Sequence, residues 1–158
     1  MKKGYGDIDI KQLVKADWNY KEENETLTEK LTENIKRNGQ IENLLIRELD
    51  TGFYEVVNGN HRLDVMKALK LKKAHCYNFG KISEKQASRI AIETNETKFD
   101  TDSVVLAERI KELTTEFDLE DLVKTLPYSE KEIENFSKLT DFDWEQYADK
   151  EVDTFDDI

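Results

Sequence analysis

The chain has 158 residues, of which 37% are charged, and its formal net charge is −11. This length fits one domain, or one domain with a small appendage, that can bury a core without cross-links. The single cysteine excludes a disulfide scaffold and a cysteine-rich metal site. No apolar run approaches the length of a membrane span and no signal-peptide stretch is seen, so we expect a cytoplasmic protein.

The negative charge is concentrated at the C-terminal end. Residues 141–158 contain eight acidic residues and one lysine, which gives a net charge of −7, so residues 1–140 carry −4. Such a surface repels polyphosphates at long range. The charge therefore disfavours direct DNA binding by this chain, which would need a local basic patch or a protein partner.

Strand and helix signals alternate in the first half of the chain. Alternating residues predict a short strand at 8–10, and an irregular polar segment follows around Trp18. Thr26 and Glu29 have the spacing of a capping box and predict the start of a helix, with Gly39 at its C-terminus. The apolar face of this helix is formed by residues four apart, namely Leu27, Leu31 and Ile35.

A hairpin, a helix and a strand complete this half. Apolar runs at 44–49 and 53–57 flank an Asp-Thr-Gly turn, a pattern typical of a β-hairpin. A helical period then runs over residues 62–71, and residues 74–79 predict another strand.

The remaining signals are helical. Ser83 and Gln86 form a second capping box, residues 100–102 precede a longer helix, and Ser129 caps the last helix. A short helix is predicted between these two, around residues 119–123. We therefore expect an α+β protein in which a small mixed β-sheet with helices is followed by a helical, helix-turn-helix-like subdomain. The expected parts are an α/β domain, the helical subdomain and an acidic tail, at residues 5–80, 83–139 and 140–158.

The junction between the second hairpin strand and the following helix is the most informative motif. A strand runs through Gly59 directly into a helix, which directs free backbone N–H groups and the helix dipole at one spot. His61 and Arg62 add donors there, and an arginine can bind two phosphate oxygens at once. The pattern indicates a phosphate-binding turn. The alternative is an ordinary tight turn, in which Arg62 pairs with an acid such as Asp64 and His61 caps or packs.

With this junction, the order of elements from residue 8 to residue 139 resembles the ParB/sulfiredoxin superfamily. The resemblance is to the ParB-like N-terminal (ParB-like nuclease) domain of phage and mobile-element proteins. Residues 59–62, Gly-Asn-His-Arg, match the family's Gly-x-x-Arg box. Residues 18–21 and 94–98 lie where ParB proteins have their first phosphate-contacting motif and their Glu-Asn-x-x-Arg motif. Residues 119–139 match the helix-turn-helix-like region of the family.

The resemblance implies a binding site for a nucleotide, CTP or ATP with Mg²⁺. It assigns contacts with the nucleotide or its phosphates to residues of the three motifs, namely Lys21, Gly59, Asn60, His61, Arg62 and Lys98. Asn95 corresponds to the family's metal-contacting asparagine and would position Mg²⁺. The resemblance assigns no catalytic residue.

The box departs from both branches of the superfamily. ParB proteins usually have Glu and Arg after the glycine, where this chain has Asn60 and His61. Sulfiredoxins have a catalytic cysteine at the position of Asn60, so this chain lacks the thiol and is not expected to be a sulfiredoxin. Thr94 replaces the acid beside Asn95, which disfavours nucleotide hydrolysis more than nucleotide binding.

Several other side chains have structural alternatives. Lys21, which precedes two glutamates, either contacts phosphate or is solvated, and Asn95 either positions a metal or ends a helix. We expect Trp18 in the core or in the wall of a groove rather than stacked on a base. Cys76 is predicted to be a small buried hydrophobic residue on a strand, and His75 to be structural.

The last helix and the tail are acidic. The first turn of the last helix carries three acidic residues, Glu130, Glu132 and Glu134. Acidic side chains at this place are unsuited to contact with DNA phosphates and base edges. We therefore predict a degenerate helix-turn-helix that acts as a scaffold or a protein-docking surface. The tail places aromatic residues among its acids, at Phe142, Trp144, Tyr147 and Phe155. It is either an interaction segment that orders on a partner, a mimic of nucleic-acid charge, or a solvated end.

The sequence thus leads to three hypotheses of function. The first is a ParB-like nucleotide-binding protein that acts in DNA partition, processing or modification of a phage or mobile element, with a DNA-processing protein as partner. The second is a non-catalytic adaptor or regulator of a DNA-processing complex, which uses its acidic surface and tail. The third is a ParB-like nuclease or a weak nucleoside triphosphatase. Because the dimerisation domain of ParB proteins has no counterpart here, we expect a monomer or weak dimer without membrane association.

Overall fold

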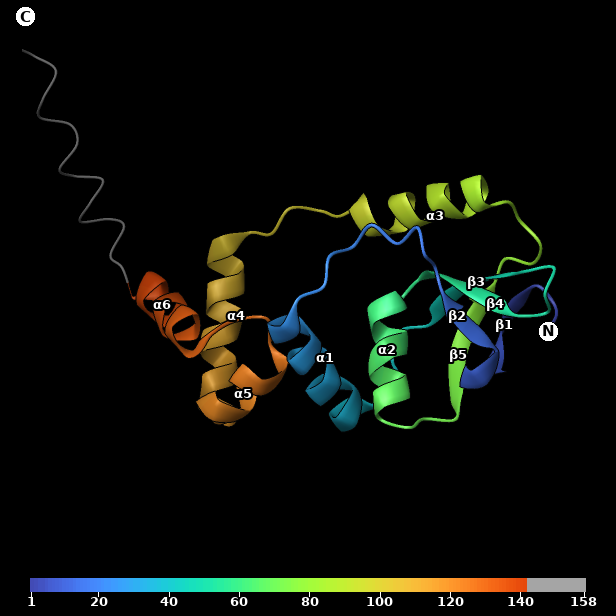
Figure 1. Ribbon diagram of the computed structural model, residues 1–158. Helices are drawn as coiled ribbons and strands as arrows, with labels where there is room; N and C mark the ends of the chain where they lie inside the picture. The colour runs from blue at the N-terminus through green and yellow to red at the C-terminus, as the bar shows by residue number, and fades with distance from the viewer. Residues whose placement is uncertain (142–158) are drawn as a thin grey trace, which may run out of the picture. The chain divides into compact units, whose positions relative to one another are not determined.

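The computed structural model describes residues 1–141, and the chain divides into two compact units, Met1–Phe99 and Asp100–Ile158. Figure 1 shows the sheet and the first three α-helices in the first unit and three further helices in the second. The predicted interaction segment with its four aromatic residues lies outside the described residues. Within residues 1–141, no helix combines the length and the apolar character needed to cross a membrane.

The first unit is built on a five-stranded sheet with the strand order β1-β5-β3-β4-β2. β1 pairs with β5 and β3 with β4 in antiparallel fashion, whereas β2 runs parallel to β4 and β3 parallel to β5. The strands are β1 (Gly4–Asp9), β2 (Leu13–Lys15), β3 (Leu44–Glu48), β4 (Tyr54–Asn58) and β5 (Lys73–Asn78). The mixed sheet and the α+β class are as predicted, and β3 with β4 confirms the hairpin.

Helices cover both faces of the central strands. α1 (Glu25–Asn38) and α2 (Asn60–Ala68) enclose the main core, to which β4 contributes the fully buried Val56. α3 (Glu84–Glu96) packs on the next residue, Val57, whose side chain points to the opposite face because successive strand residues alternate. β4 is therefore buried on both sides, and its end leads into the site described below.

The side chain of Cys76 lies buried in the main core on β5, as predicted. Burial raises the pKa of its thiol to about 12, and the negative charge of Asp7 acts in the same direction. The neighbouring His75 is exposed, and its Nδ1 atom pairs with Asp7 across the β1–β5 ladder. Both residues therefore serve the sheet, Cys76 by packing and His75 by a cross-strand contact.

The start of α1 differs from the prediction by two residues. The side chain of Asn24 accepts a hydrogen bond from the Leu27 N–H at 3.0 Å, so the helix begins at Glu25 and Thr26 is not its cap. Asparagine at this position satisfies one of the free donors of the first turn. Gly39, with a φ angle of 73°, ends the helix as predicted.

Two other features of the first unit differ from the sequence analysis. β2 was not predicted, because three residues are too few to show an alternating pattern and its parallel partner β4 is distant in the sequence. α3 begins with the predicted capping box of Ser83 and Gln86, but it belongs to the first unit rather than to the helical part. The reason is that its small residues pack on β4, namely Ala87 and Ala91.

The second unit contains three helices in its described part. They are α4 (Ser103–Glu116), α5 (Leu119–Thr125) and α6 (Glu130–Thr140). Ser129 caps α6, as predicted, and α4 is capped by Asp102, the last of the residues expected to precede it. Each helix contributes one buried residue to the core of this unit, namely Ile110, Leu122 and Ile133. The predicted role of these helices as a degenerate helix-turn-helix stays a prediction.

Candidate functional site

The turn between β4 and α2 has a backbone conformation that favours glycine. Gly59 has a φ angle of 108° and a ψ angle of 22°, in the left-handed region. A Cβ atom at this position would lie 2.6 Å from Leu44 Cδ2 and 3.2 Å from Arg62 Nη1. The absence of a side chain therefore lets the Arg62 guanidinium approach the backbone of the turn.

The N-terminus of α2 offers unpaired backbone donors. No side chain caps it, and the Leu63 N–H donates to the Gly59 carbonyl at 2.9 Å. The N–H groups of Asn60, His61 and Arg62 precede this bond and have no partner within the helix. Together with the helix dipole, they make this terminus suited to an anion.

A pocket of about 290 Å³ lies at this helix terminus, and we call it the α2 pocket. Its walls come from the polar segment between β2 and α1 (residues 16–24), from α1, from the β4–α2 junction and from the end of α3. The pocket brings together six of the seven predicted site residues, namely Lys21, Gly59, Asn60, His61, Arg62 and Asn95. Lys98 follows α3 and does not line the pocket.

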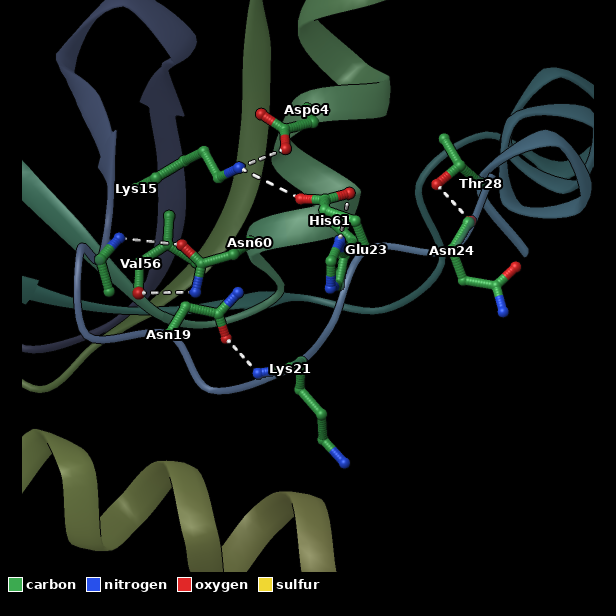
Figure 2. A network of polar contacts seen from close by, with 11 residues as sticks. Lys15, Asn19, Lys21, Glu23, Asn24, Thr28, Val56, Asn60, His61 and Asp64 are labelled. Atoms are coloured by element: carbon green, nitrogen blue, oxygen red, sulfur yellow. Dashed lines mark hydrogen bonds and ion pairs between the residues drawn. The ribbon is translucent and has the colours of Figure 1, made fainter. Parts of the chain in front are cut away.

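The side chain of Asn60 is used for structure. Its Oδ1 atom accepts a hydrogen bond from the Ala16 N–H at 3.0 Å, and its Nδ2 atom donates to the Val56 carbonyl at 3.2 Å. Figure 2 shows both bonds, which join the polar segment to β4. The side chain is buried, so Asn60 can offer a ligand its backbone N–H rather than its amide.

His61 has one engaged and one unpartnered nitrogen. Its Nδ1 atom lies 3.5 Å from Glu23 Oε2, as the dashed line in Figure 2 marks. Its Nε2 atom is buried and has no hydrogen-bond partner in the described part of the chain. A buried polar atom without a partner is costly. This atom has almost no exposed surface, so it is not itself open to a ligand in the α2 pocket.

Arg62 is paired, but not with the acid considered in the sequence analysis. Its Nη2 atom donates to Glu42 Oε2, and the Arg62 side chain is 19% exposed. Desolvation lowers the pKa of Arg62, and the charge of Glu42 raises it. Asp64 pairs instead with Lys15, with 2.6 Å between Nζ and Oδ2 (Figure 2). Glu42 was missed because it lies in a loop twenty residues before Arg62 in the sequence.

Lys21 ties the polar segment to the end of α3. Its Nζ atom lies 2.8 Å from Glu96 Oε1, and the Tyr20 hydroxyl donates to the same oxygen at 3.0 Å. The hydrogen bond to Glu96 raises the pKa of Lys21, and the hydrogen bond from Lys21 is the main cause of the lowered pKa of Glu96. Lys21 is therefore positioned at the rim of the pocket rather than freely solvated.

The three basic side chains of the pocket share one feature. Each is held by a glutamate from a different part of the first unit: α3, the polar segment, and the loop between α1 and β3. The pairs are Lys21–Glu96, His61–Glu23 and Arg62–Glu42. The basic side chains of the pocket are thus already paired with carboxylates, although none of these three glutamates lines the pocket itself.

Trp18 is half-buried against a core cluster, which agrees with the predicted core position, and it does not line the α2 pocket. It packs in the cluster under α3, and its Nε1 atom donates to Glu55 Oε1 at 2.9 Å. The same oxygen accepts a hydrogen bond from Arg47 Nε at 2.8 Å, in an ion pair whose side chains are about 10% exposed. The polar segment is therefore anchored to the β3–β4 hairpin through a buried charge pair.

Comparison with known proteins identifies the family. Residues 5–96, more than half of the chain, match the family model of the ParB N-terminal domain. The chain belongs to the ParB N-terminal domain family. No curated protein sequence matches it.

Solved structures of the ParB/sulfiredoxin superfamily are similar to the chain. The C-terminally truncated chromosome-partitioning protein ParB from Caulobacter crescentus, complexed with CTP-γ-S, is 21% identical with a TM-score of 0.75, covering 92% of this chain and 83% of that chain. A Pnob8-like ParB-N domain is 22% identical with a TM-score of 0.51, covering 87% and 61%. Sulfiredoxin from Arabidopsis thaliana is 17% identical with a TM-score of 0.44, covering 56% and 96%. The family match and the first of these structures confirm the predicted superfamily.

In this ParB-family pocket, Asn95 and Glu22 carry the oxygen atoms that suit Mg²⁺. Asn95 lies in the last turn of α3 and is not its C-cap, which is Thr97. Residues 1–141 contain no group of three or more His, Cys, Asp or Glu side chains placed to hold a metal ion. The donor set fits a Mg²⁺ ion that shares its ligands with phosphate oxygens and water, not a self-contained metal centre.

Proposed function

We propose that the α2 pocket binds a nucleoside triphosphate with Mg²⁺, either CTP or ATP. The protein would act in DNA partition, processing or modification of a phage or mobile element. One observation carries the proposal: an uncapped helix N-terminus and the Arg62 side chain lie at one pocket, which His61 also lines. The CTP-γ-S complex of a ParB with the same fold supports a nucleotide as the ligand.

Each group has a defined role in this proposal. The N–H groups at the start of α2 bind phosphate oxygens, and Arg62 binds them through two donors. His61 contributes its backbone N–H at the start of α2, and Lys21 adds a positive charge from the polar segment. Asn95 and Glu22 orient Mg²⁺, which neutralises part of the triphosphate charge near the glutamates of the pocket. Lys98 lies outside the pocket lining, so the proposal gives it no contact.

The ligand would replace anions that the protein already provides. The three basic side chains are each held by a glutamate, so binding exchanges carboxylates for phosphates. The electrostatic gain is therefore smaller than the number of basic residues suggests. We expect Mg²⁺ to be required for tight binding, because without it the triphosphate and the displaced carboxylates repel each other.

Calorimetry and thermal unfolding with CTP, ATP, GTP and UTP, with and without Mg²⁺, test the proposal on the full chain freed of co-purified ligand. One triphosphate with Mg²⁺ should raise Tm, since a ligand at about 100 times its Kd stabilises the folded state by about 2.7 kcal/mol. Arg62→Gln should weaken binding about ten- to a hundredfold, because hydrogen bonds to charged groups contribute about 1.5–3 kcal/mol.

Arg89→Gln is the matched control for this experiment. Arg89 lies on α3 outside the pocket, where it pairs with Glu93 at 2.7 Å, and its replacement is the same chemical change. Its nucleotide affinity should equal that of the unaltered protein. Absence of binding by every triphosphate, or an equal loss in both variants, would contradict the proposal.

The charge of the second unit favours the adaptor hypothesis as a second candidate. Residues 100–158 contain six Lys and Arg and nineteen Asp and Glu, a net charge of −13. Such a surface fits a basic protein partner. A pull-down from the native host should then recover a basic DNA-processing protein, and the triple variant Glu130→Gln, Glu132→Gln, Glu134→Gln should not recover it.

DNA cleavage or phosphate release that disappears in Arg62→Ala and Asn95→Ala would instead support the nuclease or hydrolase hypothesis.

A further inference from the structure

The first unit contains a basic stretch in an otherwise acidic chain. Residues 65–83 contain five lysines and no aspartate or glutamate. The first unit as a whole has eighteen Lys and Arg against sixteen Asp and Glu, a net charge of +2, whereas the second carries −13. The sequence analysis missed this difference because it divided the charge only between the tail and the remainder.

Four of these lysines, together with Lys11, meet where α2 leads into β5, and we call this surface the basic end. Figure 1 shows the turn between α2 and β5, beside which the C-terminal end of α1 lies. The 3-10 helix η1 (Ile10–Gln12) adjoins the turn, because the Ile10 N–H donates to the Lys72 carbonyl at 2.9 Å. The basic end consists of Lys11, Lys67, Lys70, Lys72 and Lys73, all of which are exposed.

Backbone contacts fix the basic end to the rest of the unit. The Lys70 N–H donates to the Lys67 carbonyl at 3.0 Å, and Lys73 is a ladder residue of β5 opposite β1. On the side of α1, the Gln40 amide makes two hydrogen bonds with the backbone of His75, at 2.7 and 2.8 Å. The lysines therefore project from a framework held by hydrogen bonds.

The lysines of the basic end differ from the basic residues of the α2 pocket. None of the five has an ion pair with an acid among the described residues. Of the acids along the β1 ladder, Asp7 pairs with His75, and Asp9 lies opposite Lys73 without an ion pair to it and accepts a hydrogen bond from the Lys11 N–H. The charge of the five lysines is thus available to an external anion.

A structural explanation accounts for part of this cluster. Cations near a helix C-terminus offset its dipole, which suits Lys67 in the last turn of α2. Lys72 and Lys73 lie beyond that helix, and Lys11 lies on a separate element, so the dipole does not explain them.

We propose that the basic end binds the phosphate backbone of double-stranded DNA without sequence preference. Lysine acts as a point charge on a flexible stem, which suits phosphate neutralisation rather than recognition of base edges. Leu71 is the one large hydrophobic side chain among residues 67–73 that is exposed, at 38%, so the surface lacks the apolar face that anchors a membrane-binding helix.

Binding at the basic end should be weak and sensitive to salt. Non-specific binding to phosphates typically has a Kd of about 10⁻⁴–10⁻⁶ M at physiological salt. The charge of the second unit acts against it, but salt screens exposed charges beyond about 8–10 Å. The basic end therefore supplies the local patch that a chain with a net charge of −11 needs for contact with nucleic acid.

Fluorescence anisotropy of a labelled duplex of arbitrary sequence, titrated with the full chain, tests this proposal. The measured quantity is the slope of log K against log salt between about 50 and 200 mM, which reports about 0.9 per neutralised phosphate. The triple variant Lys70→Gln, Lys72→Gln, Lys73→Gln should reduce the magnitude of the slope by about 2.7, if each lysine contacts one phosphate. Its circular dichroism spectrum should be unchanged.

The control triple variant is Lys2→Gln, Lys3→Gln, Lys85→Gln, which makes the same change of charge at exposed residues away from the basic end. Its slope should equal that of the unaltered chain. The proposal fails if the unaltered chain does not bind the duplex at the lowest salt, or if both triple variants lose equally. It also fails if polyglutamate or anionic vesicles compete as well as unlabelled DNA. Nucleotide binding should be unaffected by the basic-end variant, so the two proposals are tested separately.

Discussion

Arg62 lines the α2 pocket and is paired with Glu42, a residue of the loop between α1 and β3 that does not line the pocket. The side chain of Glu42 is 75% exposed, whereas that of Arg62 is 19% exposed, so a solvated acid is joined to a largely desolvated cation. A phosphate would compete with this carboxylate for the same guanidinium. Glu42 is therefore placed to weaken ligand binding while it keeps Arg62 oriented.

Glu42→Gln should raise the affinity of the pocket for a triphosphate by up to about fivefold. The reason is that an exposed ion pair contributes about 0.2–1 kcal/mol, which the ligand no longer has to overcome. Calorimetry would measure the change, with Glu29→Gln on the exposed part of α1 as a control that alters charge equally. Weaker binding by Glu42→Gln would show that the carboxylate is needed to position Arg62.

Lys70 has a φ angle of 57°, in the left-handed region that glycine adopts more easily. Lys70→Gly should therefore raise the free energy of unfolding by about 1 kcal/mol and Tm by about 2–4 °C. The same change should weaken DNA binding, because it removes a charge from the basic end. Scanning calorimetry and the anisotropy titration measure the two effects.

Lys70→Gln separates strain from charge at this position. It keeps the backbone cost and removes the positive charge, so Tm should stay close to that of the unaltered chain while DNA binding falls as in Lys70→Gly. A lower Tm for the glycine variant would indicate that the lysine side chain contributes more to stability than its backbone conformation costs.

At the scale of elements, the buried pair of Arg47 and Glu55 connects the β3–β4 hairpin with the polar segment. The two residues face each other in the ladder, and Arg47 Nη1 also donates to the Ile82 carbonyl at 3.0 Å ahead of α3. Glu55 in addition accepts a hydrogen bond from Trp18. One carboxylate thus orients a strand pair, the segment that lines the α2 pocket, and the entry to α3.

Glu55→Gln should lower the free energy of unfolding by about 3 kcal/mol, because removing one partner leaves a buried charge uncompensated. Urea unfolding followed by circular dichroism would measure this loss. Glu93→Gln breaks the exposed pair with Arg89 by the same chemical change and should cost less than about 0.5 kcal/mol. Equal losses in the two variants would contradict the argument from burial.

The elements that the sequence predicted are those with local signals. The hairpin has a turn sequence, α3 has a capping box, and Gly39 ends α1. β2 has no such signal, because its pairing with β4 depends on contacts between distant residues. The start of α1 was misplaced because Asn24 and Thr26 are both good caps, and only the folded chain selects between them.

At the scale of the whole molecule, the family and the residues around the α2 pocket could be predicted, but their partners could not. The motifs carry chemistry at fixed positions, which is why six of the seven predicted residues line one pocket. The glutamates that hold Lys21, His61 and Arg62 come from separate elements and have no motif. The use of the Asn60 amide for structure likewise depends on the fold, which brings Ala16 beside it.

The division of charge between the two units is visible only once their boundary is known. A net charge of −11 describes neither part, because the first unit carries +2 and the second −13. The partners proposed above follow this difference: nucleotide and DNA for the first unit, and a basic protein for the second. The affinity of the full chain for DNA would depend on the charges of both units. The salt dependence of that affinity would report the number of phosphates contacted, so it is the more informative measurement.

The burial of Cys76 makes the opening of the sheet measurable. Thiolate is the form that reacts with alkylating reagents, and with a pKa of about 12 the folded chain holds almost none of it at neutral pH. When β5 separates from its neighbours, the thiol meets water and regains ordinary reactivity. The chain has one cysteine, so an alkylating reagent adds one mass increment per molecule. The rate of this addition reports how readily the sheet opens, and no residue has to be introduced for the measurement.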